Sequence, residues 1–219
     1  MVSILKAEQI SKSFNEHLVL SNVYFGLATG EILGVFGKNG SGKSTLFSIL
    51  FGTLKADQIF LFHNGKPIRN RRQFRKLLSL STQVIFLPDR LKLKNVIEML
   101  VTSKNKEQLL LDSYLSESLE QTISELPLGL VRYIQSKCIL YNHKPFCLLD
   151  EPFSGLSPIL TKELKLDIQK QSQHKGIAII DHNYQEVLDI STKNMMLKNA
   201  SSYNLSNSKA LKELGYIIS

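Results

Sequence analysis

Short apolar runs separated by helix-length segments are the main pattern along the chain. Runs of four or five mostly apolar residues, typical of buried strands, occupy 32–36, 84–87, 146–149 and 177–180. Segments with a helical pattern follow three of them, at 46–51, 158–172 and from about 184. Gly52 is placed to end the first helix, and Pro88 stops the run at 84–87. Strands that alternate with helices favour an α/β fold with a parallel sheet.

The N-terminal part follows a different pattern. The runs 18–20 and 23–25 are typical of strands in a small antiparallel sheet, and 59–62 is a further strand. The dipeptide Asn64-Gly65 that follows is a turn signal. We therefore expect a small antiparallel β subdomain beside the parallel core.

A helical insert is expected within the core. From 94 to about 126 the pattern is helical, with an apolar residue at every fourth position from Leu111 to Ile123. A second helix is expected over 129–141. The polar tail at 201–208 is expected to form a loop.

The composition fits one domain of this kind. The chain has 219 residues and 43% of them are hydrophobic, which is enough for a substantial core. We predict a single domain over 1–219, divided into a core with its β subdomain at 1–91 and 138–219 and a helical subdomain at 92–137. No apolar run reaches the ~18 residues of a membrane span, and no N-terminal signal pattern is present. Cys138 and Cys147 are interpreted as buried thiols of a reducing compartment, so we expect a cytoplasmic location.

The formal net charge of +8 favours acidic partners such as nucleic acid or lipid head groups. The densest basic cluster consists of Lys66, Arg69, Arg71, Arg72, Arg75 and Lys76. Among these cations Phe74 is the one interleaved aromatic residue. We interpret the cluster as a solvated face, and nucleic acid is not expected as a partner.

The junction between the strand at 32–36 and the helix at 46–51 carries GKNGSGKST, whose spacing matches the P-loop pattern G-x-x-x-x-G-K-[ST]. Its glycines let backbone N–H groups point into one concavity at the positive end of a helix, which suits phosphate. Lys43 can reach the β- and γ-phosphates, and the Ser44 hydroxyl can ligate Mg²⁺. The alternative is a flexible Gly/Ser turn. We expect nucleotide binding by Gly37, Asn39, Gly40, Ser41, Gly42, Lys43, Ser44 and Thr45.

Two carboxylates and a histidine follow other predicted core strands. Asp150 and Glu151 come directly after the run at 146–149. Asp150 can hold the Mg²⁺ shell beside Ser44, and Glu151 can polarise the attacking water. His182 follows the run at 177–180 and is assigned to sensing the γ-phosphate. The alternatives are a helix cap for the carboxylates and a structural role for the histidine.

Three segments in this order, GKNGSGKST, LLDEPFSGLSP and IIDHN, resemble an ATP-binding cassette (ABC) ATPase. The resemblance spans nearly the whole chain and is nearest the single-cassette subunits of branched-chain amino acid importers and lipopolysaccharide exporters. It implies a P-loop NTPase (RecA-like) core, ATP and Mg²⁺ as cofactors, and ATP hydrolysis with Glu151 and His182 as catalytic residues. It also implies that Phe14 stacks on adenine. The partners implied are a membrane-spanning permease subunit and a second cassette, in a homodimer or heterodimer at the inner face of the cell membrane.

The segment that corresponds to the family's glutamine loop departs from its pattern. The family has Pro-Gln after a strand, whereas Pro88 is followed here by Asp89. Asp89 is expected to ligate Mg²⁺ in place of the glutamine. Gln83 is not assigned to this role, because it precedes the strand predicted at 84–87.

The signature motif, LSGGQ in the family, is also altered. In the family, the last residue of the motif precedes by 20 positions the aspartate that corresponds to Asp150. This distance places the motif at Leu126, Pro127, Leu128, Gly129 and Leu130. In the family its serine and backbone N–H groups grip the γ-phosphate bound to the opposite subunit, but Pro127 has neither a hydroxyl nor an N–H. The loss of two donors to a charged phosphate would cost about 3–6 kcal/mol. Pro127 is equally suited to begin a helix.

A third departure lies after Glu151, where Ser157 replaces the aspartate that reaches across the family's dimer. Ser157 followed by Pro158 is a sound helix start. Six residues that the resemblance assigns to action within one subunit are intact: Phe14, Lys43, Ser44, Asp150, Glu151 and His182. The elements that act on the opposite subunit, at Pro127, Leu128 and Ser157, are degraded. We expect weak ATPase activity. The alternative function is a soluble ABC-type ATPase that acts in nucleic-acid or ribosome-related regulation.

Overall fold

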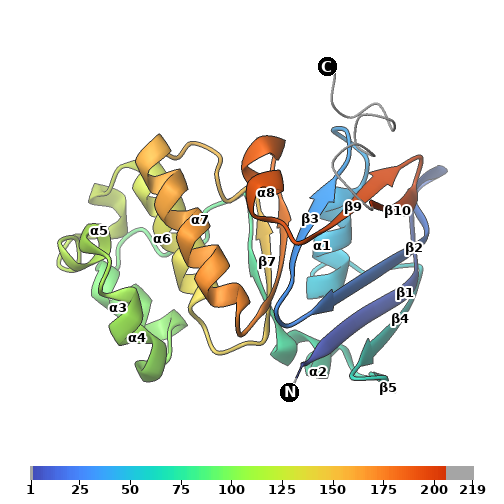
Figure 1. Cartoon of the computed structure of the whole chain (residues 1–219), viewed down its shortest axis with the longest axis horizontal. Coiled ribbons are helices and arrows are strands. Elements are labelled where there is room, and N and C mark those ends of the chain that lie inside the picture. Colours follow the sequence, from blue (N-terminus) through green and yellow to red (C-terminus); the bar gives the residue numbers. More distant parts are fainter. Residues whose placement is uncertain (1, 206–219) are drawn as a thin grey trace.

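A six-stranded sheet crosses the centre of the computed structural model, which describes residues 2–205 apart from the side chains at 71, 103 and 104 (Figure 1). Its strand order is β10-β9-β3-β8-β7-β6, and neighbours are parallel except for β10 and β9. The strands are β3 (Ile32–Phe36), β6 (Leu78–Ser81), β7 (Phe146–Asp150), β8 (Gly176–Ile180), β9 (Lys193–Lys198) and β10 (Ser201–Leu205). The expected α/β core is confirmed. A loop was expected at 201–208, but residues 201–205 form the strand β10. Residues 206–208 lie outside the described residues.

The prediction of a strand at 84–87 was wrong. That segment contains no strand, and Val84 and Phe86 are 74% and 42% exposed. The strand of this region is β6, in which leucine and serine alternate although all four residues are buried. Ser79 is accommodated because its hydroxyl donates to the carbonyl oxygen of Phe146 at 3.2 Å. Alternating apolar and polar residues are typical of a strand with one exposed face, so the pattern does not reveal that β6 is buried on both faces.

A four-stranded antiparallel sheet with the order β2-β1-β4-β5 confirms the expected β subdomain. Its strands are β1 (Ile4–Phe14), β2 (His17–Ala28), β4 (Gln58–His63) and β5 (Lys66–Pro67). Between this sheet and the central sheet lies α1 (Lys43–Phe51), which ends at Gly52 as expected. Leu148 packs in the core on this side of the central sheet, and Leu149 packs in the core on the other side.

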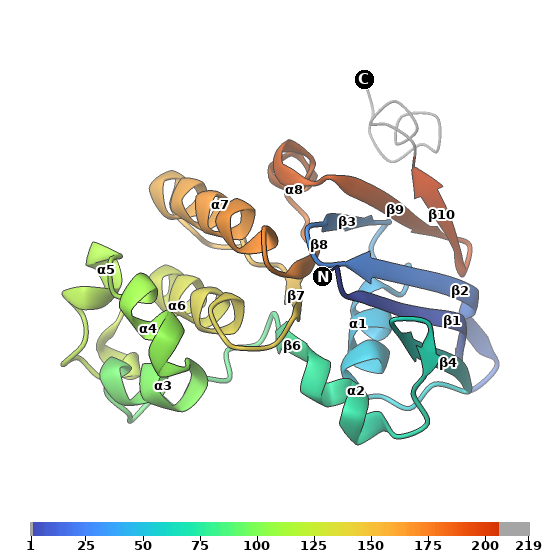
Figure 2. The same cartoon turned by 60° about the horizontal axis from the view of Figure 1, so that its bottom comes forward.

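The other side of the central sheet is covered by α6 (Leu128–Leu140), α7 (Pro158–Ser172) and α8 (Tyr184–Ile190). Figures 1 and 2 both place these helices away from the antiparallel sheet, and α2 (Arg71–Leu77) leads into β6. The helices predicted at 158–172 and from 184 are confirmed, and α6 lies within one residue of its prediction. None of the helices described is long and apolar enough to cross a membrane.

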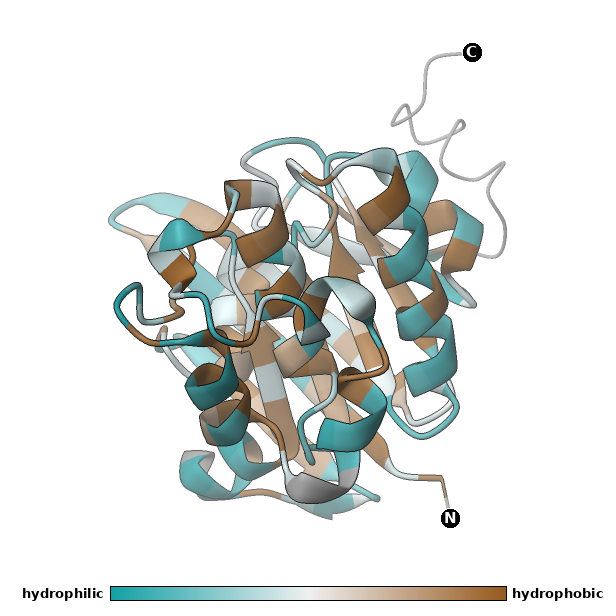
Figure 3. Cartoon of the chain, turned by 90° about the vertical axis from the view of Figure 1, so that its left-hand side faces the viewer, coloured by the Kyte–Doolittle hydropathy of each residue, from teal (hydrophilic) through white to brown (hydrophobic). Residues whose placement is uncertain are grey.

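The insert consists of short helices and not of one long helix. They are α3 (Leu93–Leu100), α4 (Ser103–Leu109), α5 (Ser113–Ser116) and the 3-10 helix η1 (Ile123–Glu125). Asp112 begins α5 by accepting the Tyr114 N–H, and Thr122 begins η1 with a capping box. Leu111 is 81% exposed, so the fourfold spacing of apolar residues does not mark one helix face. Figure 3 shows hydrophobic and hydrophilic residues mixed along these helices. The subdomain boundaries at 91/92 and 137/138 stay a prediction, although α6 runs unbroken through the second.

Candidate nucleotide-binding site

The P-loop lies between β3 and α1, as predicted. Gly40 and Gly42 have φ angles of +78° and +96°, which favour glycine. A Cβ on Gly42 would also lie 2.9 Å from Cδ2 of Leu20, so the β subdomain packs directly against this turn. The turn therefore requires glycine for both its conformation and its packing.

Lys43 lies inside this loop. Its Nζ donates to the carbonyl oxygens of Gly37 at 2.7 Å and Lys38 at 3.2 Å, and the residue is 8% exposed. Burial lowers the pKa of Lys43, while Asp150 and Glu151 oppose that change. The ammonium is thus placed where phosphate oxygens can accept its hydrogen bonds.

Asp150 ends β7 beside the P-loop, and its carboxylate is hydrogen-bonded to the Ser44 hydroxyl. Its Oδ1 is buried without a hydrogen-bond partner in the described part of the chain. Burial raises the pKa of Asp150 to about 6, and the bond from Ser44 opposes the rise. A carboxylate oxygen and a hydroxyl are the hard ligands that Mg²⁺ prefers, so this pair fits the ion.

Glu151 lies beside His182, and both follow neighbouring parallel strands. Oε1 of Glu151 is 2.8 Å from Nε2 of His182, and the Glu151 side chain is 10% exposed. Its Oε2 accepts a hydrogen bond from Nε2 of Gln83 at 2.9 Å. Both oxygens of the predicted base are therefore held by side chains from the segments that follow two other strands, β6 and β8.

Gln83 was wrongly excluded from the site. It follows β6 and does not precede a strand, so it lies at the same edge of the sheet as Asp150 and Glu151. Asp89 lies instead in the turn that leads to α3, where its carbonyl oxygen accepts the Ser124 N–H at 2.9 Å. The structure thus places Gln83, and not Asp89, against the Glu151 carboxylate.

A cavity of about 400 Å³ brings most of the predicted residues together. It is lined by His17, Val19, Asn39, Gly40, Gly42, Lys43, Ser44, Thr45, Gln83, Glu151, Ile180 and His182. Sequence reasoning missed His17 and Val19, whose only signal was their place just after Phe14. Phe14 itself is 45% exposed at the end of β1 and does not line this cavity. Nζ of Lys12 lies 5.1 Å from the centre of the Phe14 ring.

The altered signature motif begins α6. Pro127 is the N-cap residue, as its alternative interpretation predicted, and Leu128 is 63% exposed. A Cβ on Gly129 would lie 2.7 Å from the carbonyl oxygen of Gly155, so this glycine is required by a close backbone contact. Ser157 caps α7 by accepting the Leu160 N–H at 3.3 Å.

A P-loop, a carboxylate pair and a histidine at one edge of a mostly parallel sheet define a P-loop nucleoside triphosphatase with an inserted helical subdomain. Residues 20–154 match the family model for the ABC transporter domain. The chain therefore belongs to the ABC transporter family, as an ATP-binding cassette subunit that binds and hydrolyses ATP.

Two curated relatives span most of the chain. The lipopolysaccharide export system ATP-binding protein LptB of Haemophilus influenzae is 30% identical over 207 residues, which cover 86% of this chain and 84% of that protein. The lantibiotic transport ATP-binding protein SrtF of Streptococcus pyogenes is 29% identical and covers 84% of this chain and 82% of that protein.

Solved structures share the fold. An ATP-binding subunit of an ABC transporter has a TM-score of 0.85 at 20% identity and covers 97% of this chain and 94% of its own. The ADP conformation of the cassette MJ1267 has a TM-score of 0.79 at 21% identity and covers 96% and 94%.

Proposed function

We propose that this chain uses ATP-dependent dimerisation to drive a separate membrane-spanning partner at the inner face of the cell membrane. The observation that supports this best is the convergence of Lys43, Ser44, Glu151 and His182 on one cavity. Lys43 and the P-loop bind the phosphates, Glu151 polarises the attacking water, and His182 fixes Glu151 and contacts the γ-phosphate. Ser44 and Asp150 would hold Mg²⁺, which would neutralise charge on the phosphates when bound.

The nucleotide assignment is tested with Lys43→Ala. ATP with Mg²⁺ should raise the unfolding temperature of the unchanged protein, because it binds the folded state alone. The variant should lose most of this increase. Thr53→Ala is a matched control, because Thr53 lies beyond α1 and does not line the cavity. An unchanged increase in Lys43→Ala would overturn the assignment.

Exposed apolar side chains after β6 and on α3 support a protein partner. Val84 and Phe86 lie in the segment after β6, and Met99 lies on α3 with 67% of its surface exposed. We expect a membrane protein to co-purify with the chain. Val84→Ser with Phe86→Ser should weaken that association, whereas Leu166→Ser, which changes an exposed residue of α7, should not. Retention of the membrane protein by the double variant would contradict this docking surface.

We propose further that hydrolysis by a homodimer is slow. Pro127 and Leu128 would stand at both composite sites and supply few donors to the γ-phosphate of the opposite subunit. Such donors act on charge in the transition state, so turnover should be affected more than ATP affinity. A heterodimer with a cassette that has an intact signature would hydrolyse ATP at the Glu151 site of this chain.

The test restores the motif with Pro127→Ser, Leu128→Gly and Leu130→Gln together. Turnover should rise clearly, and adding Glu151→Gln should abolish the gain. Ordinary cassette rates in the unchanged protein alone would contradict the proposal.

The alternative of a regulator that acts on nucleic acid has less support. In the basic cluster, Arg75 donates to the carbonyl oxygens of Phe51 and Gly52, which end α1. This arginine therefore has a structural role. A filter-binding measurement with RNA at physiological salt should show only weak, salt-sensitive binding.

A further inference from the structure

The backbone of Glu151 is held in an unfavourable conformation. Its φ angle is +56°, in the left-handed region that a glutamate adopts rarely. Such a conformation costs about 1–3 kcal/mol and persists only when the surrounding structure determines it. The contacts that hold Glu151 are therefore part of the catalytic arrangement.

Three consecutive contacts join Glu151 and the loop after it to the end of β8. The Glu151 N–H donates to the Ile180 carbonyl oxygen at 2.7 Å, and the Phe153 N–H donates to Oδ2 of Asp181 at 2.9 Å. The third is the 2.8 Å contact between Glu151 and His182. The Asp181 side chain thus holds the loop that follows Glu151.

Asp181 is suited to this task by its burial and by its second bond. It is 4% exposed, and its Oδ1 accepts the Asn183 N–H at 2.8 Å. The Asp181 carboxylate thus holds the backbone N–H of Asn183, next to His182, and that of Phe153, two residues after Glu151. Each oxygen has one backbone donor, so the orientation of the carboxylate is determined.

We propose that Asp181 is a positioning residue for ATP hydrolysis, which holds the loop after Glu151 so that the Glu151 carboxylate stays beside His182. The inference rests on the proposed role of Glu151 as the base. Without the Phe153 bond, Glu151 can relax to an ordinary backbone conformation, and its carboxylate leaves the path of the attacking water. Binding of ATP by the P-loop does not depend on this bond.

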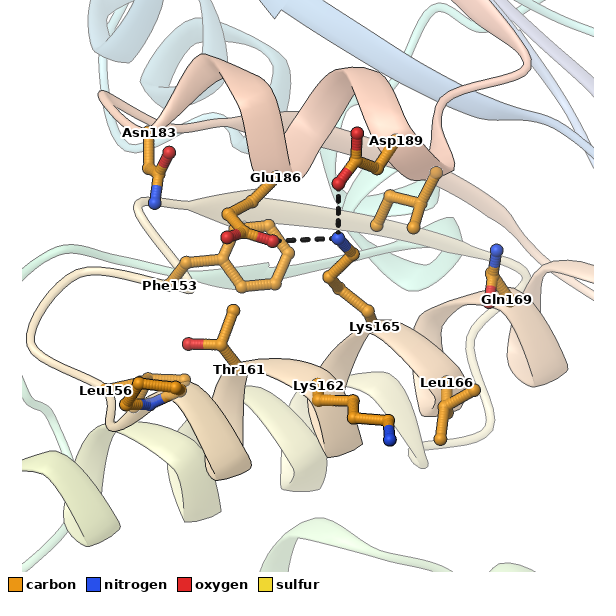
Figure 4. A pocket seen from close by; sticks show the side chains of 12 residues that line it. Phe153, Leu156, Thr161, Lys162, Lys165, Leu166, Gln169, Asn183, Glu186 and Asp189 are labelled. Atoms are coloured by element: carbon orange, nitrogen blue, oxygen red, sulfur yellow. Dashed lines mark hydrogen bonds and ion pairs between the residues drawn. The ribbon is translucent and has the colours of Figure 1, made fainter.

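A second connection between the same two elements provides a control. Nζ of Lys165 on α7 lies 2.8 Å from Glu186 and 2.7 Å from Asp189, both on α8 (Figure 4). These ion pairs border a cavity of about 540 Å³, which Phe153 and Leu156 of the Glu151 loop also line, but they join α7 to α8 and do not include the Asp181 carboxylate. Lys165→Met loosens the packing of α7 on α8 without removing the Phe153 bond.

The experiment compares Asp181→Ala, Asp181→Asn and Lys165→Met in steady-state hydrolysis, ATP affinity and amide hydrogen exchange of the 151–157 segment. Asparagine has one acceptor oxygen, so it loses one of the two bonds without changing the shape of the side chain. In both Asp181 variants we expect kcat to fall by about tenfold or more, because small misplacements of a catalytic group are costly, while ATP affinity stays within about threefold. Exchange of the 151–157 segment should accelerate. Lys165→Met should change neither kcat nor this exchange.

Unchanged kcat in Asp181→Asn would overturn the proposal, and so would a parallel loss of kcat and ATP affinity. If Asp181→Ala does not fold, Asp181→Asn decides. Glu151→Gln separates this inference from the proposed function. If Glu151→Gln hydrolyses ATP normally, the role of Glu151 as the base fails. If Glu151→Gln is inactive and Asp181→Asn is fully active, only the role of Asp181 fails.

Discussion

The side-chain amide of Gln83 donates to the Glu151 carboxylate across 2.9 Å, although the two residues are 68 positions apart in the chain. The contact joins the loop after β6 to the end of β7, the neighbouring strand. Gln83 also lines the nucleotide cavity, so its amide oxygen can reach Mg²⁺ or the attacking water. We therefore propose that this glutamine, and not Asp89, takes the role expected of the family's glutamine.

Gln83→Ala should lower kcat by about tenfold to a hundredfold, because a hydrogen bond that orients the base is lost. The matched control is Asp89→Ala, which removes a side chain that does not line the cavity and should leave kcat within about twofold. Steady-state hydrolysis over a range of Mg²⁺ concentrations measures both variants. A larger loss in Asp89→Ala than in Gln83→Ala would return the role to Asp89.

Asp150 should make the stability of the nucleotide-free protein depend on pH. Burial raises its pKa from 3.8 to about 6. Between pH 3.8 and about 6, Asp150 holds a proton in the folded protein that it has released in the unfolded chain. The contribution of Asp150 to stability therefore falls as the pH rises through this range. The fall is at most about 3 kcal/mol. Relative to the unchanged protein, Asp150→Asn should therefore gain roughly 1–3 kcal/mol between pH ~4 and pH ~7.

Urea unfolding without nucleotide or Mg²⁺ measures this difference. Asp57→Asn is a control of opposite sign, because the backbone bond from Ser13 and the side chain of Lys12 lower the pKa of Asp57. That variant should lose stability relative to the unchanged protein as the pH rises through the ordinary range of an aspartate. Parallel pH profiles for the unchanged protein and Asp150→Asn would contradict the prediction.

Lys137 should be critical for the stability of the domain. It is 3% exposed on α6, and its Nζ pairs with Asp112 of the insert and, at 2.7 Å, with Asp167 of α7. Tyr141 also donates to Asp167, at 2.6 Å. Lys137→Met leaves two carboxylates whose side chains are 9% and 16% exposed without their cation, and should lower the free energy of unfolding by about 3–5 kcal/mol. Lys165→Met breaks a more exposed set of ion pairs and should cost about 0–1 kcal/mol. Equal effects in denaturant unfolding would contradict this account.

Phe14 should contribute to nucleotide affinity by stacking on the base. The exposed ring can add about 0.5–1.5 kcal/mol beyond its buried area, so Phe14→Ala should weaken ATP binding roughly twofold to tenfold. Stacking accepts any purine, so ATP and GTP should bind within about tenfold of each other. Titration calorimetry with both nucleotides measures this, and Phe60→Ala, at another exposed ring, is the control. A much sharper preference for ATP would require a residue that reads the edge of the base.

Much of this arrangement could be predicted from the sequence because it is local. The P-loop is contiguous, and its conformation depends on Gly40 and Gly42 within it. The helix α7 begins at a serine cap followed by Pro158, and its bounds match the prediction. Asp150 and Glu151 follow an unbroken apolar run, so their place at the edge of the sheet depends only on the direction of that strand.

Other features were decided by contacts between distant segments. β6 is buried on both faces but alternates leucine with serine, so its pattern is that of a half-exposed strand and not of a buried one. The error at 84–87 then assigned Gln83 and Asp89 to the wrong places. The bonds of Asp181 to Phe153 and of Lys137 to Asp112 and Asp167 join residues between 25 and 30 positions apart. The sequence pattern shows only the periodicity of one segment. The partners of these residues depend on which strands lie side by side and which helices cross, and the packing of the core determines both.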